Sequence, residues 1–491
     1  MKRNNTNDFR QRTIAELLKS ITKQELRHLT NYLKTHCTPG TLQLWLLLKT
    51  KHPKFDITDE YIRDNTRPNK PLSDKHYRYQ LADLSKHTKA FIAEQEFRNN
   101  KLQYANSLAN ALMKRNAVLN YKKIRQQNEQ LFTKERKPDA NQYHYLQEYH
   151  SIDFQFNTVN QPNKVSNSLQ LASDNHDYSF LINKLRWIIA MQNRSRVVKK
   201  TFNDQHEKAF IDYLTNFSLD ELPLIKAYYL ALLQFQQNTY EQFVSYKEHV
   251  LSIRHQFDRD EMRQLLTLAG NFCVLNIQEG KLEFLEERFM ITKINVEEGF
   301  LNVLNYFSNN HFLITLRDAV EAEQLSWAYD FLKTKLPETH PDHQINLELL
   351  GWAIWYFAKG DYEKQEEYMV EMQSTDYKFY DFYNELAYKV LQLKTDYILL
   401  GNKPAGLSAA GRPKKLVKEV FKSRLSSYLL YLRRKENLLE SIRDSRINFG
   451  KALRLIYNKR YGTQRIDKDL ETEILALKPI TELPWLLKEL G

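Results

Sequence analysis

Few residues in this sequence could do chemistry, and none completes a catalytic or metal-binding pattern. His144 and Glu148 are four residues apart, so on a helix both side chains would lie on one face. Two ligands without a third make a weak metal site, and an ion pair is the simpler interpretation. The acidic pairs Glu286-Glu287, Glu297-Glu298 and Glu366-Glu367 are typical of the solvated faces of amphipathic helices. We therefore expect no general acid–base pair.

Motifs for phosphate and metal binding are also missing from the sequence. Neither GxxxxGK[ST] nor GxGxxG occurs, and 12 glycines in 491 residues leave little material for a phosphate-binding loop. No HExxH or CxxC spacing occurs, and the two cysteines, Cys37 and Cys273, lie far apart, as is typical of reduced thiols. We predict a protein that is not an enzyme and that has no catalytic residues, no metal and no cofactor.

The strongest candidate binding residues are cations near the C-terminus. Residues 411–415, GRPKK, are similar to the core of an AT-hook, which lies in the DNA minor groove, although Ala410 stands where that motif has a basic residue. A linker that ends with proline in the first turn of a helix explains the same residues. Further on, tyrosines alternate with cations, which suits either nucleic-acid contact or buried tyrosines beside solvated cations. The candidate nucleic-acid contacts are Arg412, Lys414, Lys415, Lys418, Lys422, Arg433, Arg434, Lys459 and Arg460.

The net charge of +12 is unevenly distributed along the chain. Residues 1–150 and residues 403–465 each carry a balance of +13, whereas residues 151–402 carry −11 and residues 466–491 carry −3. Basic ends of this kind either contact an acidic partner such as nucleic acid or dock on the acidic middle of the chain itself. The sequence leaves both alternatives open.

The elements that must position these residues are predicted to be helices. Glycine and proline are scarce, and no stretch alternates β-branched and polar residues over the length of a strand, so the fold class is all-α. No apolar run is long enough to span a membrane, and the polar N-terminus does not resemble a signal peptide. We therefore expect a cytoplasmic protein without a membrane span.

The clearest pair of helices lies in residues 345–372. Residues 347–358 are nearly all apolar or aromatic, so the first helix must be covered on most sides. Gly360-Asp361 supplies a left-handed helix stop, since glycine has no Cβ to clash there. In the second helix, Met369 and Met372 are predicted to point inward.

This pair resembles a tetratricopeptide unit. Trp352-Ala353, Tyr356 and Gly360-Asp361-Tyr362 fall at the spacing of that family, whereas Gln365 stands where the family has a small alanine. The corresponding positions of earlier pairs are separated by 42, 45 and 35 residues, which predicts an irregular, tetratricopeptide-like helical-repeat array. An ordinary helical hairpin in an irregular bundle is the alternative. The positions compared are Tyr240, Leu282, Trp327 and Tyr362.

Local signals divide the chain into four parts. We predict an N-terminal helical domain over residues 1–135, the helical-repeat region over 136–400, a linker over 401–415 and basic C-terminal helices over 416–491. Capping boxes are predicted at Thr22 with Glu25 and at Ser218 with Glu221, since Ser or Thr followed by Glu three residues later opens many helices. We also predict that residues 97–131 form a polar-rich helical stretch and that Trp187 lies within a strongly apolar helix. Trp485 is predicted to hold the C-terminus against the core.

Four stretches together resemble a family of uncharacterised α-helical proteins of about this length, found in many copies in Bacteroidota bacteria. They are residues 14–33, 67–84, 183–198 and 477–490. The resemblance implies an all-α, tetratricopeptide-like architecture and carries no catalytic residues with it.

These observations predict a non-enzymatic helical-repeat scaffold that mediates protein–protein interaction. An array of helix pairs presents an extended surface that suits a protein or peptide partner, here a basic or amphipathic one. The alternative is a nucleic-acid-binding regulatory protein that uses the basic N- and C-terminal regions. The position of the cations separates the two, because one contiguous basic face favours nucleic acid.

Overall fold

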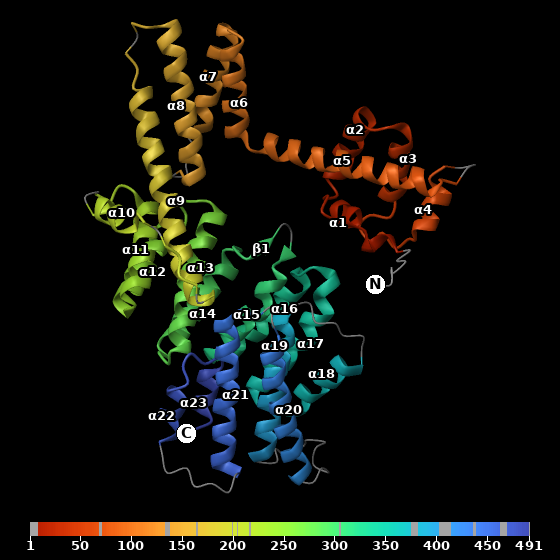
Figure 1. Cartoon of the computed structure of the whole chain (residues 1–491), viewed down its shortest axis with the longest axis vertical. Helices are drawn as coiled ribbons and strands as arrows, with labels where there is room; N and C mark the ends of the chain where they lie inside the picture. Colours follow the sequence, from red (N-terminus) through yellow and green to blue (C-terminus); the bar gives the residue numbers. More distant parts are fainter. Residues whose placement is uncertain are drawn as a thin grey trace. The chain divides into compact units, whose positions relative to one another are not determined.

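The computed structural model describes residues 8–67, 71–132, 138–163, 165–198, 200–203, 205–215, 218–303, 306–374, 382–401, 414–435, 438–461 and 469–490. Within these ranges the chain forms 23 α-helices, three 3-10 helices and one hairpin of two-residue strands (Figure 1). The predicted all-α class is confirmed. In the described part of the chain, no helix combines the length and the apolar character needed to cross a membrane.

The chain divides into two compact units. The first unit is Met1–Lys134 with Tyr145–Ser173, and the second is Glu135–His144 with Asp174–Gly491. The elements of the first unit are η1 Phe9–Gln11, α1 Thr13–Lys19, α2 Glu25–His36, α3 Pro39–Lys49, α4 Asp59–Asn65, α5 Asp74–Asn99, α6 Lys101–Lys114 and α7 Val118–Phe132. Helices α8 Ala140–Asn160 and α9 Ser168–Val198 contribute to both units.

Helices α1 to α5 surround one apolar core in the first unit. Trp45 and Leu84 are fully buried in this core, which also contains the apolar stripe of α5. The capping box before α2 is confirmed, because the Thr22 amide donates to Glu25 Oε2 at 2.8 Å and the Glu25 amide donates to Thr22 Oγ1 at 3.3 Å. The Ser73 side chain caps α5.

Residues 97–131 are helical, as predicted, but they do not form a single helix. The chain forms a hairpin there, in which α6 packs against α7 (Figure 1). Asn100 caps α6 by accepting a hydrogen bond from the Gln103 amide at 3.1 Å. Asn116 has a φ of 55°, in the left-handed region that asparagine tolerates, and this residue turns the chain between the two helices. Both breaks are therefore made by asparagines rather than by glycine or proline.

The second unit contains the remaining elements. These are α10 Glu207–Leu214, α11 Pro223–Gln237, α12 Tyr240–Ile253, α13 Arg259–Gln278, α14 Phe284–Glu297, β1 Asn302–Val303, β2 Tyr306–Phe307, α15 Asn309–Glu321, α16 Leu325–Lys335, η2 Leu336–Glu338, η3 Pro341–His343, α17 Gln344–Lys359, α18 Tyr362–Ser374, α19 Phe382–Gly401, α20 Lys414–Arg434, α21 Glu440–Tyr461, α22 Leu470–Leu475 and α23 Leu483–Lys488.

Helices α11 to α18 form four consecutive pairs, and each pair packs against the next (Figure 1). The turn between α17 and α18 is as predicted, since Gly360 is left-handed with a φ of 80°. Met369 and Met372 are buried, as expected. Gln365 is also fully buried, and its Oε1 accepts a hydrogen bond from Thr395 Oγ1 of α19 at 3.3 Å. This amide therefore fills the place of the small alanine and joins the pair to the next helix.

Two local predictions in the second unit are wrong. No side chain caps α11, which begins at Pro223 directly after Leu222, so the expected capping box of Ser218 and Glu221 is not formed. Trp187 is 68% exposed, although Leu185 and Ile188 on either side are buried. The buried face of α9 repeats at three- and four-residue spacing, and position 187 lies off that face.

The C-terminal helices share a core with the helix before them. Side chains of α19 lie in the same apolar cluster as those of α20, α21, α22 and α23. Trp485 packs against this cluster and against the core of α15 to α18, so the prediction that it clips the C-terminus onto the core is confirmed. Of the predicted linker, residues 402–413 lie outside the described residues, and α20 begins at Lys414.

Candidate functional site

The candidate nucleic-acid contacts lie mainly on α20 and α21. Arg412 is outside the described residues, as are the side chains of Lys414 and Lys415 at the start of α20. Lys418 Nζ lies 5.8 Å from the ring centroid of Tyr461, and Lys422 Nζ lies 5.6 Å from that of Tyr457. These two cations therefore rest on aromatic rings of the neighbouring helix.

The other candidates divide between the two ends of the helix pair. Arg460 donates to the Tyr397 hydroxyl at 2.9 Å and lies 3.5 Å from Glu489 Oε2, so it is engaged within the chain. Arg433 and Arg434 are exposed and form no ion pair with any described residue. They lie eleven residues beyond Lys422, which is about 16 Å along a helix. The structure thus places the candidates in two groups.

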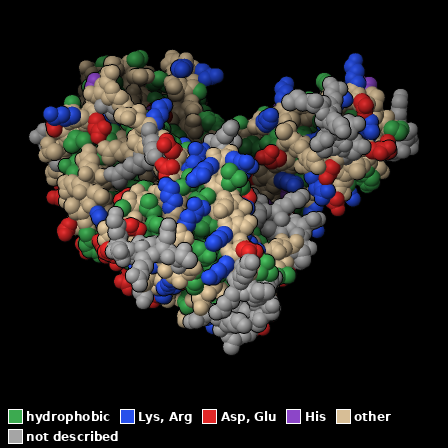
Figure 2. Space-filling model, turned by 60° about the horizontal axis from the view of Figure 1, so that its bottom comes forward, with side chains coloured by type: hydrophobic (Ala, Val, Ile, Leu, Met, Phe, Trp, Pro, Cys, Tyr) green, Lys and Arg blue, Asp and Glu red, His purple; other side chains and the backbone are tan. Residues whose placement is uncertain are grey.

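Lys and Arg side chains do not form one uninterrupted patch on the face drawn in Figure 2. They are interspersed there with hydrophobic side chains (Figure 2). A mixed surface of this kind suits protein contact as well as nucleic-acid contact.

A cavity that the sequence did not predict lies inside the second unit. Its volume is about 690 Å³, and it is lined by residues of α9, α13, α14, α15 and α21 and by residues 479–484. Three arginines line it, namely the buried Arg446 and the half-buried Arg288 and Arg317. Sequence spacing could not reveal this site, because these residues come from helices far apart in the chain.

Glu482 is the central acid of the cavity wall. Its side chain is 7% exposed, and it forms ion pairs with Arg317 and with Lys394, whose Nζ lies 2.9 Å from Glu482 Oε2. Burial raises the pKa of Glu482, but Lys394 and Arg317 outweigh burial and lower it to about 2. This carboxylate is therefore charged at neutral pH and holds the residues before α23 against α15 and α19.

A second buried ion cluster stands beside the first. Arg288 of α14 pairs with Asp318 of α15, and Arg288 Nη1 lies 3.2 Å from Glu321 Oε2. Asp318 also accepts a hydrogen bond from Thr292 Oγ1 at 2.7 Å. Burial raises the pKa of Asp318 to about 6, although Arg288 opposes this shift. The positive charges of Arg288 and Arg317 are therefore matched by carboxylates of the protein.

Arg446 differs from the other two arginines. It is only 8% exposed, its Nε has no hydrogen-bond partner, and no carboxylate of the described residues lies within ion-pair distance. Burial lowers the pKa of Arg446. Tyr428 and Glu482 oppose this shift, and burial raises the pKa of the Tyr428 phenol to about 12. Glu482 already pairs with Arg317 and Lys394, so Arg446 is a buried cation that forms no ion pair of its own with a described carboxylate.

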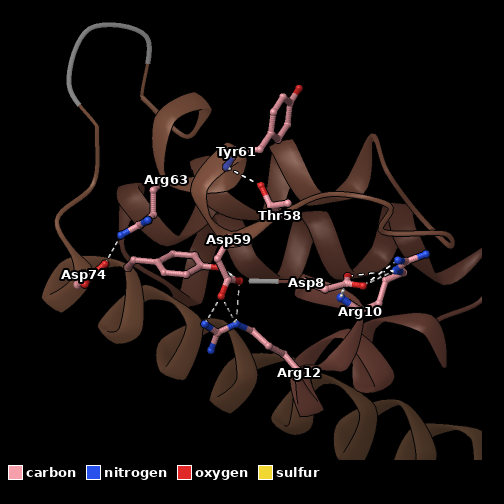
Figure 3. Close-up of polar contacts among 9 residues, drawn as sticks. Asp8, Arg10, Arg12, Thr58, Asp59, Tyr61, Arg63 and Asp74 are labelled. Atoms are coloured by element: carbon pink, nitrogen blue, oxygen red, sulfur yellow. Dashed lines mark hydrogen bonds and ion pairs between the residues drawn. The ribbon is translucent and has the colours of Figure 1, made fainter. Parts of the chain in front are cut away.

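The polar cluster of the first unit has a structural role. Arg12 Nε donates to Asp59 Oδ1 at 2.8 Å, and the Tyr77 hydroxyl donates to the same oxygen at 2.8 Å (Figure 3). Arg63 also forms an ion pair, with Asp74 (Figure 3). These contacts join the start of α1 to α4 and α5. Because Asp59 is buried and already has two donors, the cluster offers little to a ligand.

The described side chains include no group of three His, Cys, Asp or Glu residues that could hold a metal ion.

Comparisons with protein-family models, with curated proteins and with solved structures found no match. The resemblances noted in the sequence therefore stay predictions.

Proposed function

We propose that this chain is a non-enzymatic scaffold whose irregular, tetratricopeptide-like helix pairs bind a protein or peptide partner. The observation that carries the proposal is the stacking of α11 to α18, in which α11 packs on α13 and α15 packs on α17. Arrays that stack in this way present an extended surface assembled from several pairs, and such surfaces usually hold an extended or helical segment.

The surface chemistry supports a basic or amphipathic partner. Residues 151–402 carry a net charge of −11, which attracts cations. On α9, Phe180 is 51% exposed and Trp187 is 68% exposed, seven residues apart and thus on one side of the helix. Exposed tryptophan is the residue type most enriched where proteins make their strongest contacts. A partner with cations and an apolar face would match both features.

Selection of peptides from a random-sequence display library tests this proposal. We expect the selected peptides to be basic or amphipathic, and to bind the full chain with micromolar dissociation constants. The Trp187→Ala variant should weaken their binding at least tenfold. Leu119→Ala, which removes an 83% exposed apolar side chain from the first unit, is the matched control and should have no effect. Failure to enrich any peptide family would refute the proposal.

Nucleic-acid binding is the second candidate function, and the exposure of Arg433 and Arg434 favours it. We expect the double variant Arg433→Gln/Arg434→Gln to reduce the slope of log K against log salt by about 2 for duplex DNA, because each phosphate contact contributes about 0.9 to that slope. Lys200→Gln/Lys208→Gln removes two exposed cations from the acidic middle and should leave the slope unchanged. No binding of the unmodified chain to DNA or RNA at low salt would exclude this candidate.

A further inference from the structure

We propose that the cavity of the second unit is a binding site for a small organic anion, and that Arg446 binds the carboxylate or phosphate group of this ligand. The inference goes beyond the scaffold function and does not depend on it, because it concerns the binding of a small molecule and not of a protein or peptide partner.

The burial of Arg446 without a partner is the first argument. A buried charge is stable only when it is paired and hydrogen-bonded, and an uncompensated buried ion costs several kcal/mol. Arg446 is 8% exposed and lines the cavity, yet its Nε bonds to no atom of the described residues. A guanidinium presents its N–H groups in a planar fork that matches a carboxylate or a phosphate. An anion in the cavity would complete this site.

The charge distribution around the cavity is the second argument. The other cations around the cavity already have carboxylate partners. Glu482 pairs with Arg317 and Lys394. Asp318 and Glu321 pair with Arg288. Counting Arg446, four cations therefore face three carboxylates, namely Glu482, Asp318 and the half-buried Glu321. The remaining carboxylate of the cavity wall, Glu279, is exposed. One negative charge is missing from the interior.

The polar lining of the cavity suits an organic ligand. Asn193, Asn271 and Ser441 reach the cavity from three different helices and can hydrogen-bond to hydroxyl or carbonyl groups. A volume of about 690 Å³ falls within the range of small-molecule sites and exceeds what a simple inorganic ion needs.

The chain's own C-terminal segment closes one wall of the cavity. The Ile480 amide donates to the Gln278 carbonyl at 3.2 Å, and the Thr481 amide donates to the Ser445 carbonyl at 3.2 Å. The Asn448 side chain donates to the Pro479 carbonyl at 3.2 Å. These bonds fix residues 479–481 between α13 and α21, so this part of the wall is held by the chain's own contacts.

Isothermal titration of the full chain with inorganic phosphate and with citrate tests the proposal and distinguishes the two anion chemistries. We expect at least one of them to bind with a stoichiometry of one, and Arg446→Met to weaken this binding at least tenfold. Arg454→Met, which removes an exposed cation from the same helix, is the matched control and should bind as the unmodified chain does.

The stability of the ligand-free variants provides a second measurement. Because Arg446→Met replaces an unmatched buried cation with an apolar side chain of similar length, the ligand-free variant should melt at the same temperature as the unmodified chain or higher. A lower melting temperature would show that the protein itself compensates this charge, and would overturn the proposal. The absence of binding by both anions, or equal binding by Arg446→Met, would overturn it as well.

Discussion

Replacement of Glu482 by glutamine should release the C-terminal segment from the second unit. The substitution keeps the shape of the side chain and removes the charge that Arg317 and Lys394 share. The pKa of Glu482 falls from an ordinary 4.5 to about 2 on folding. At about 1.4 kcal/mol per unit, this difference stabilises the folded state by about 3 kcal/mol at neutral pH. Loss of one member of a buried ion pair has a similar cost.

The pH dependence follows from the direction of this shift. Since the pKa of Glu482 is lower in the folded state, its stabilising contribution is fully present above pH 4.5 and is lost as the pH falls toward 2. The difference in stability between the unmodified chain and Glu482→Gln should therefore be largest near pH 7. At pH 3 it should be less than half as large.

Hydrogen exchange followed by mass spectrometry measures this local opening. A contribution of about 3 kcal/mol corresponds to a rise of about 100-fold in the exchange rate of slowly exchanging amides in residues 477–490. Glu323→Gln is the control, because its ion pair with Lys488 holds the same segment but is exposed on both sides, so its loss should change exchange little. If both variants exchange alike, or if the effect of Glu482→Gln is the same at pH 7 and pH 3, the assignment of this stabilisation to the buried charge is wrong.

Three further predictions concern the rest of the chain. Asp59→Asn should lower the free energy of unfolding of the first unit by about 3 kcal/mol in urea denaturation, because Asp59 is a buried partner of Arg12, whereas exposed Asp56→Asn should not. Deletion of residues 403–491 should lower the melting temperature and expose apolar surface to a hydrophobic dye, because α19 shares its core with the deleted helices. Gly360→Ala should destabilise the chain by about 1 kcal/mol in thermal denaturation because φ is positive there, whereas Gly270→Ala, in a helix with open space around it, should stabilise the chain.

The sequence predicted those features that depend on local pattern. Helix periodicity, the capping box at Thr22 and the left-handed stop at Gly360 each depend on a few neighbouring residues, and all are observed. The exposure of Trp187 on α9 could not be predicted, because an apolar side chain in a sequence does not show whether another helix covers it. The break at Asn116 was missed because asparagine adopts left-handed conformations less regularly than glycine does.

The buried ion pairs of the candidate site could not be predicted from the sequence, because charge balances along the chain describe mainly exposed residues. One of the two alternatives that the balances of +13 and −11 leave open is that basic C-terminal residues meet an acidic middle region. One pair has this arrangement, since Arg424 Nη1 lies 2.7 Å from Asp396 Oδ1. The buried contact of Glu482 with Arg317 and Lys394 does not, because Glu482 lies beyond the basic block and supplies the acid, whereas both bases belong to the middle.

The independence of the buried pairs from the regional charge has a physical reason. Burial removes a charge from water, so a buried ion requires a specific partner at bonding distance, and the average charge of a region does not provide one. In the interior of the second unit, Glu482 therefore forms ion pairs with two cations, whereas Arg446 forms none with a described carboxylate. Removal of Glu482 should consequently destabilise the ligand-free chain, because it leaves buried cations without their carboxylate. Removal of Arg446 should not destabilise it and should tend to stabilise it, because it removes a buried cation that forms no ion pair.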